Sequence, residues 1–312
     1  MPQPAAPKQP ASARLHWTQF AAILLGVGLA IMVSGGGAAA LWGKAASIFA
    51  PQKSSHIPHS DPDLDRQQPQ KQAEILMERA VSHSDENADQ IETQVEARVD
   101  TWRGHLQWDS QLGDLTTVAL NSSDESVRAS AIEVQLAAYG LSKNDATVDG
   151  LVRQADSRDH AKKIWALWAL GLLGNRGVQS DRVVRVLASH LKDSGKDIER
   201  DQDEDSRRWA VEGLALVGTT QTIEPLLEAL HNDASPIVRE RAACGLAESG
   251  MLSHQQRLIA VPRLINYSDD PALDAQTQAW AFQALADITK QHLPNDSAAW
   301  RNWYQTSVAS GQ

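Results

Sequence analysis

The segment "RRWAVEGLALVG", residues 207–218, decides the fold, because its pattern occurs in five copies along the chain. The other copies are "VRASAIEVQLAAYG" (127–140), "KIWALWALGLLG" (163–174), "VRERAACGLAESG" (238–250) and "QAWAFQALADIT" (278–289). When aligned, the copies share an alanine at intervals of 32 to 44 residues: Ala131, Ala166, Ala210, Ala242 and Ala281. Four copies add a second small residue three positions later, followed by leucine. This spacing forms a narrow helical face against which another helix packs closely.

Each of the first four copies is followed by another apolar segment with helical periodicity. These segments are "TVDGLVRQA" from Thr147, "SDRVVRVLASHL" from Ser180, "QTIEPLLEAL" from Gln221 and "QQRLIAVPRLINY" from Gln255. We therefore interpret each copy as the first helix of a pair and the segment after it as the second. Gly174, Gly218 and Gly250, which end three copies, are typical of helix C-caps. A helix pair repeated at this spacing, with no strand signal, predicts an all-α, right-handed α-solenoid.

The repeated residues also resemble a known family. The "VR-x-x-A" opening, the Ala-x-x-Gly/Ala-Leu core and the trailing glycine are similar to bacterial HEAT-like repeats, the repeat type also found in phycobilisome-lyase subunits. The resemblance covers residues 107–290. It implies a solenoid of HEAT-like helix pairs. It says less about activity, and it leaves open a lyase-like enzyme or enzyme subunit that acts on a chromophore or small molecule.

Two flanking segments are expected to close the ends of the solenoid, which would otherwise expose apolar faces. Residues 71–106 are interpreted as two helices that form a divergent N-terminal cap. Residues 291–312 are interpreted as a C-terminal capping helix and tail, in which Trp300, Trp303 and Tyr304 recur at helical spacing. The alternative for these aromatic residues is a docking patch for a partner.

A long uncharged segment precedes the repeats. Residues 20–42, "FAAILLGVGLAIMVSGGGAAALW", would span ~34 Å as a helix, which predicts one transmembrane helix. A cytoplasmic tail (1–19) would precede it, and a disordered linker (43–70), rich in Pro, Gln, Ser and Asp, would follow it. Basic residues ahead of the span favour a single-pass protein of the bacterial inner membrane with a periplasmic C-terminal domain. The alternative is secretion after cleavage of a signal peptide.

Composition limits the chemistry. With 39 acidic and 29 basic residues the formal net charge is −10, and no basic block is present, so nucleic acid is not an expected partner. The single cysteine, Cys244, excludes an intramolecular disulfide and a multi-cysteine metal site. Because Cys244 aligns with Glu133, Trp168, Glu212 and Gln283, we expect it at the rim of its helix, reachable by thiol reagents and without a catalytic role.

Two further patterns of residues resemble ligand sites. Asp201, Asp203, Asp205 and Glu212 have the spacing of a calcium loop, but the repeat register makes residues 209–217 helical, so a solvated acidic turn is the simpler interpretation. Trp165, Trp209 and Trp280 occupy one repeat position, which favours packing over ligand stacking. We therefore expect no catalytic, metal or cofactor site, and no enzymatic activity.

The remaining candidates are charged residues on the second helices, which we expect to line a concave face. Their sign alternates from repeat to repeat, in the order Arg182 and Arg185, Glu224 and Glu228, Arg257 and Arg263. Mixed charge of this kind suits an unknown protein partner. The sequence thus predicts a membrane-anchored HEAT-repeat scaffold that mediates protein interaction at the cell envelope.

Overall fold

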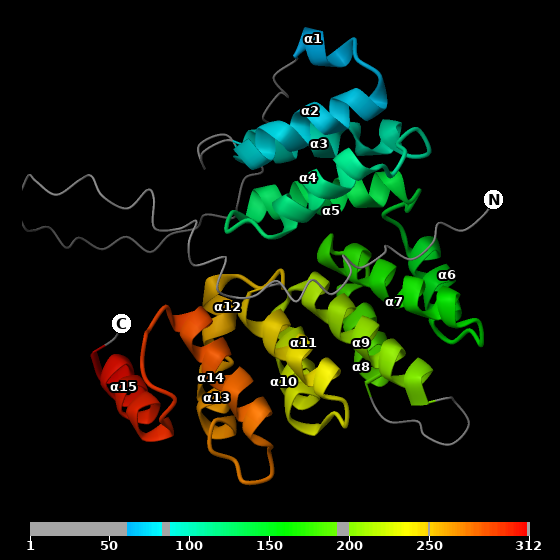
Figure 1. Ribbon diagram of the computed structural model, residues 1–312. Coiled ribbons are helices and arrows are strands. Elements are labelled where there is room, and N and C mark those ends of the chain that lie inside the picture. The colour runs from blue at the N-terminus through cyan, green and yellow to red at the C-terminus, as the bar shows by residue number, and fades with distance from the viewer. Residues whose placement is uncertain (1–60, 83–87, 192–199, 249, 311–312) are drawn as a thin grey trace, which may run out of the picture. The chain divides into compact units, whose positions relative to one another are not determined.

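The computed structural model describes residues 61–82, 88–191, 200–248 and 250–310. These residues are largely helical and contain no strand, which confirms the all-α class (Figure 1). The helices are α1 (Pro62–Asp65), α2 (Pro69–Ser82), α3 (Ala88–Trp102), α4 (Ser110–Leu120), α5 (Glu125–Ala138), α6 (Asp145–Ala155), α7 (His160–Asn175), α8 (Ser180–Ser189), α9 (Arg200–Val217), the 3-10 helix η3 (Thr220–Thr222), α10 (Ile223–Asn232), α11 (Pro236–Ala247), α12 (His254–Leu258), α13 (Val261–Tyr267), α14 (Ala275–Thr289) and α15 (Ser297–Ser310).

Side-chain caps define where most repeat helices begin. Each of these caps accepts a hydrogen bond from a backbone N–H in the first helical turn, which would otherwise lack a partner. They are Asp109, Asp124, Asn144, Asp159, Ser235 and Asp274. The caps fix the phase of each helix, so that the aligned alanines all face the same layer. All five aligned alanines are fully buried, which confirms the register read from the sequence.

The pairing of the helices differs from the prediction. The small-residue helices α5, α7, α9, α11 and α14 are the second members of their hairpins, whereas the sequence pattern predicts them as the first. Helix α10 packs far more extensively on α11 than on α9, and α6 packs on α7 but barely on α5. The hairpins are therefore α4–α5, α6–α7, α10–α11 and α13–α14, and α8, which packs about equally on α7 and α9, is assigned to α9 by this order. The spacing of small residues shows which face of a helix is packed, and it does not show whether the partner precedes or follows.

Small residues allow the second helices to stack closely. Figure 1 shows α7, α9, α11 and α14 side by side, with α8, α10 and α13 in a layer behind them. At the crossing of α7 and α9, a Cβ atom on Gly213 would lie 2.6 Å from the carbonyl oxygen of Leu167. Each hairpin contacts mainly its neighbours, an arrangement consistent with a solenoid.

The apolar core lies between the two layers and reaches the last helix. Leu167, Leu214, Leu246 and Leu285 are fully buried along its length. At the C-terminal end Trp300 of α15 is only 1% exposed, and its ring meets that of Trp303 at a centroid distance of 5.8 Å. Helix α15 thus covers the end of the stack against α13.

Part of the segment expected to be a disordered linker is ordered. Residues 61–70 hold α1 and the start of α2, with Leu64 buried. Ion pairs of Asp61 with Arg79 and of Asp65 with Arg98 tie this segment to α2 and α3. Pro62 stands at the start of α1, where a missing N–H costs no hydrogen bond. In residues 61–70 the prolines therefore stand at the beginnings of helices. Residues 43–60, the rest of the expected linker, lie outside the described residues.

The predicted location is corrected. Among the helices that the structure describes, none is both long enough and apolar enough to cross a membrane. Helix α7 is largely apolar but has only 16 residues, whereas a helix that crosses a bilayer requires about 20 residues. A single-pass inner-membrane protein is therefore not supported. The expected span (20–42) and tail (1–19), including the alternative signal peptide, lie outside the described residues.

Candidate partner-binding surface

A ridge of charged side chains runs along α8, α10 and α13. Each of these helices buries one apolar face, for example Val183 and Leu187 on α8 or Leu226 and Leu230 on α10. Charged residues are left on the opposite face, as expected for an amphipathic helix. We call them the charged ridge, and they are Arg182, Arg185, Glu224, Glu228 and Arg263.

Some residues of the charged ridge form ion pairs, and others form none with the described residues. The guanidinium of Arg263 lies 3.1 Å from the Glu224 carboxylate, which links α13 to α10. Arg182 pairs with Asp149 of α6. Arg185 and Glu228 are exposed and make no ion pair with any described residue. The ridge therefore combines internally paired charges with charges that face solvent.

Tyr267 lies under the α10–α13 end of the charged ridge. Arg263 donates a hydrogen bond to its hydroxyl at 2.8 Å and lies 5.5 Å from its ring centroid. The ring of His231 lies 4.8 Å from that of Tyr267, and His231 Nε2 is 2.9 Å from a carboxylate oxygen of Asp270. Burial raises the pKa of Tyr267, against the opposing effect of the hydrogen bond from Arg263.

Arg257 does not belong to the charged ridge, which corrects the sequence prediction. It is only 9% exposed, and its guanidinium donates to carbonyl oxygens of Gly250 at 2.6 Å, Leu252 at 3.0 Å, Glu248 at 3.2 Å and Leu246 at 3.5 Å. Burial lowers its pKa to about 10. Arg257 thus holds together the end of α11 and the loop that follows it, and it cannot reach a partner.

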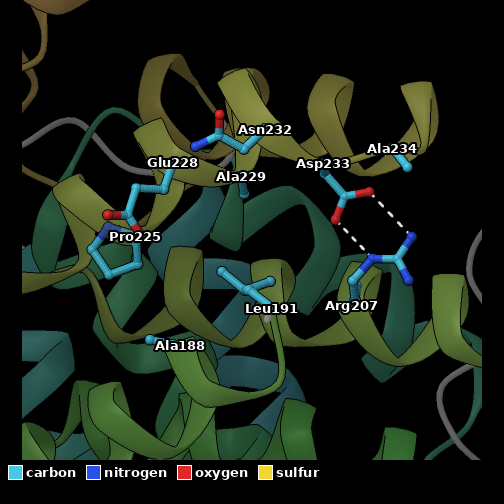
Figure 2. A pocket seen from close by; sticks show the side chains of 9 residues that line it. All are labelled: Ala188, Leu191, Arg207, Pro225, Glu228, Ala229, Asn232, Asp233 and Ala234. Carbon is cyan, nitrogen blue, oxygen red and sulfur yellow. Dashed lines mark hydrogen bonds and ion pairs between the residues drawn. The ribbon is translucent and has the colours of Figure 1, made fainter. Parts of the chain in front are cut away.

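A pocket of about 440 Å³ lies between α8 and α10, beside the charged ridge (Figure 2). Its lining comes from α8 and the residues just after it, from α9 and α10, and from the turn that leads to α11. We call it the α8–α10 pocket, and its residues are Ala188, Leu191, Arg207, Pro225, Glu228, Ala229, Asn232, Asp233 and Ala234. Figure 2 shows Arg207 and Asp233 facing each other at one end, Glu228 and Pro225 at the other, and Leu191 between them. Glu228 is the one predicted site residue in this lining.

Arg207 and Asp233 were missed as site residues, although the repeat register contains a signal for them. A cation stands three positions before the aligned alanine in four copies, at Arg128, Lys163, Arg207 and Arg239. Arg207 donates to both carboxylate oxygens of Asp233, at 2.7 and 3.2 Å. In the next repeat, Arg239 donates to a carboxylate oxygen of Asp274 at 2.8 Å. These two pairs form an arginine–aspartate ladder between successive repeats.

Cys244 shares one column of the repeat alignment with Glu133, Trp168, Glu212 and Gln283. The residues of this column differ in burial more than the alignment suggests. Cys244 is half-buried, and burial raises the pKa of its thiol to about 11. In the same column Glu133 is fully buried, and it accepts hydrogen bonds from Arg176 at 2.6 Å and Lys143 at 2.8 Å. Trp168 is buried as well. The rim position expected for this column is therefore wrong in the first two copies, where the neighbouring elements cover it.

The other residues considered for ligand binding take part in the packing or the ion pairs of the fold itself. Trp165 and Trp209 are buried, in agreement with a packing role, although their indole N–H groups make no hydrogen bond with a described residue. Glu212, the last residue of the calcium-loop spacing, lies inside α9 as the repeat register predicts, and it pairs with Arg241. Across the described residues, no cluster of three or more His, Cys, Asp and Glu side chains could hold a metal ion.

One comparison with known proteins bears on this surface. A family model described as HEAT repeats matches residues 196–286, a segment that includes α10, α11 and α13 and most of the α8–α10 pocket. No curated protein matches the chain.

Proposed function

We propose that this chain, whose residues 196–286 match a model of HEAT repeats, is a right-handed α-solenoid scaffold that holds a protein partner and has no catalytic activity of its own. HEAT repeats commonly mediate protein interactions. The observation that carries the proposal is the charged ridge, which presents both signs of charge on three successive first helices, beside an open pocket.

The distribution of charge supports a protein partner over a nucleic acid. Arginines on α8 and α13 flank glutamates on α10, so a phosphate backbone would meet repulsion at the centre of the ridge. A protein surface of mixed charge can match this order, which favours specificity and rapid association. The proposed mechanism is complementarity of shape and charge on a stacked surface.

Site-specific crosslinking tests the proposal. The photoreactive residue benzoylphenylalanine would replace Arg185 on the ridge in the full chain, and Val118, an exposed residue of α4, in a matched control. We expect irradiation in cells to join a defined protein at position 185 and not at 118. The purified partner should then bind the full chain, and Arg185→Glu should weaken the binding several-fold at low salt, because it reverses an exposed charge.

Two outcomes would count against the scaffold. The same mixture of proteins at positions 185 and 118 would show contact without a specific partner. A chromophore or small molecule that co-purifies with the full chain and is chemically changed by it would favour the lyase-like alternative instead.

A further inference from the structure

The charge inside the α8–α10 pocket is unbalanced. At one end Arg207 and Asp233 neutralise each other through two hydrogen bonds, and their side chains are only 10% and 3% exposed. At the other end stands Glu228, whose carboxylate makes no ion pair with any described residue. The pocket therefore presents one uncompensated negative charge beside a neutral pair.

The surface between these two ends is mainly apolar, with the amide of Asn232 as its polar side chain. Ala188, Leu191 and Ala229 line it, and Pro225 lies next to the Glu228 carboxylate. The volume of about 440 Å³ falls in the range of roughly 300–1,000 Å³ that ligand pockets occupy. A complementary group therefore has an apolar stem of a few carbons and a positively charged end.

Lysine and arginine side chains have this construction, because a hydrocarbon stem separates the backbone from the charge. An acidic side chain would meet Glu228, and its approach to Arg207 would compete with Asp233. A wholly apolar side chain would bury the Glu228 carboxylate without a partner, which is costly.

We infer that the α8–α10 pocket takes a lysine or arginine side chain from an exposed segment of the protein partner, with the stem along Leu191 and Ala229 and the cation beside Glu228. This inference rests on the proposed scaffold function, and it specifies which feature of the partner is recognised. It also assigns Glu228 a role distinct from Glu224, which is already paired with Arg263.

A selection from displayed peptides tests the inference without knowledge of the natural partner. The probe is a phage library of random 12-residue peptides, panned on the immobilised full chain. We expect the enriched peptides to share one lysine or arginine. Fluorescence anisotropy would then compare an enriched peptide with a version in which that residue is replaced by norleucine, which keeps an unbranched apolar stem and removes the charge.

The variant Glu228→Gln removes the charge and preserves the shape of the side chain. Because Glu228 is exposed, the variant should fold normally, which circular dichroism would verify. We expect it to bind the enriched peptide at least about tenfold more weakly, and to discriminate little between the peptide and its norleucine version. The control Glu240→Gln makes the same change at an exposed position of α11 outside the pocket, and it should bind like the wild type.

Three results would overturn the inference: enrichment of acidic or uncharged peptides, no enrichment at all, or unchanged affinity in Glu228→Gln. None of them bears on the crosslinking experiment at position 185. A partner that crosslinks there and binds Glu228→Gln normally would leave the scaffold function in place and remove only the cation-binding role of the pocket.

Discussion

Arg207 of α9 donates hydrogen bonds to both carboxylate oxygens of Asp233, in the turn before α11, so that a buried ion pair joins two successive repeats. Asp233 also accepts a hydrogen bond from the backbone N–H of Ser235 at 2.8 Å. The carboxylate is thus satisfied from both repeats at once.

Removal of the arginine should be costly. In Arg207→Gln the Asp233 carboxylate, 3% exposed, would lose its cation, and we expect the free energy of unfolding to fall by about 3–5 kcal/mol. Urea denaturation followed by circular dichroism measures this difference. Arg185→Gln, at an exposed position, is the matched control and should change the stability by less than about 0.5 kcal/mol. Equal effects of the two substitutions would show that the ladder contributes no more than surface charge.

The close crossing of α7 and α9 predicts opposite effects at two helical glycines. A Cβ on Gly213 would lie 2.6 Å from the Leu167 carbonyl oxygen, so Gly213→Ala should destabilise the chain by about 1–3 kcal/mol. A Cβ on Gly150 of α6 would meet only the end of Arg153, 4.0 Å away. Gly150→Ala should therefore stabilise the chain by roughly 0.5–1 kcal/mol, because alanine favours the helix. Thermal unfolding of both variants would reveal the difference in sign, and its absence would mean that the two helices are spaced more widely.

The Cys244 thiol should react slowly in the folded chain. With its pKa raised to about 11 from 9.0 by burial, it carries roughly a hundredfold less thiolate at pH 8 than an unburied cysteine. We expect slow labelling by Ellman's reagent in buffer and rapid labelling in urea. The sequence alone indicated an accessible thiol, and rapid labelling of the folded chain would restore that view. Cys244→Ser should leave partner binding unchanged in either case.

The contact between His231 and Asp270 should make stability depend on pH. Burial lowers the pKa of His231, but hydrogen bonds to Asn232 and Asp270 outweigh it, so the pKa is raised above its ordinary value of 6.5. The hydrogen bond to His231 lowers the pKa of Asp270. A raised histidine pKa stabilises the fold below the unfolded pKa, and this contribution is lost as the pH rises through the folded value.

The corresponding experiment compares His231→Gln with the wild type at pH 5.5 and pH 9. We expect the variant to be less stable at pH 5.5 and to approach the wild type at pH 9, as measured by urea midpoints. His292→Gln, which changes an exposed histidine, is the control. A deficit of equal size at both pH values would mean that His231 contributes packing and no charge.

The repeat register could be read from the sequence because it depends on side-chain volume. The five aligned alanines are buried as expected, since only a small residue permits the close stacking of one repeat on the next. The order of the hairpins could not be read in this way. Both neighbours of a small-residue helix are amphipathic, and only the tertiary contacts show that α10 packs on α11.

The candidate surface was predicted in part for a related reason. Periodicity placed Arg185, Glu224 and Glu228 on outward faces, and they are exposed. It placed Arg257 there as well, although four carbonyl oxygens around the end of α11 surround it. Helical periodicity describes one helix at a time, and it does not register an irregular loop that folds over a side chain. The Arg207–Asp233 pair escaped notice because its two members belong to different repeats.

The arginine–aspartate ladder also has a direction. In both of its rungs the cation comes first in the chain and its acid follows, 26 residues later for Arg207 and 35 residues later for Arg239. A ribosome makes the chain in that order, so each of these two arginines is translated before the aspartate with which it pairs. At these two junctions the ion pair that joins two repeats therefore forms only after the second repeat has been translated.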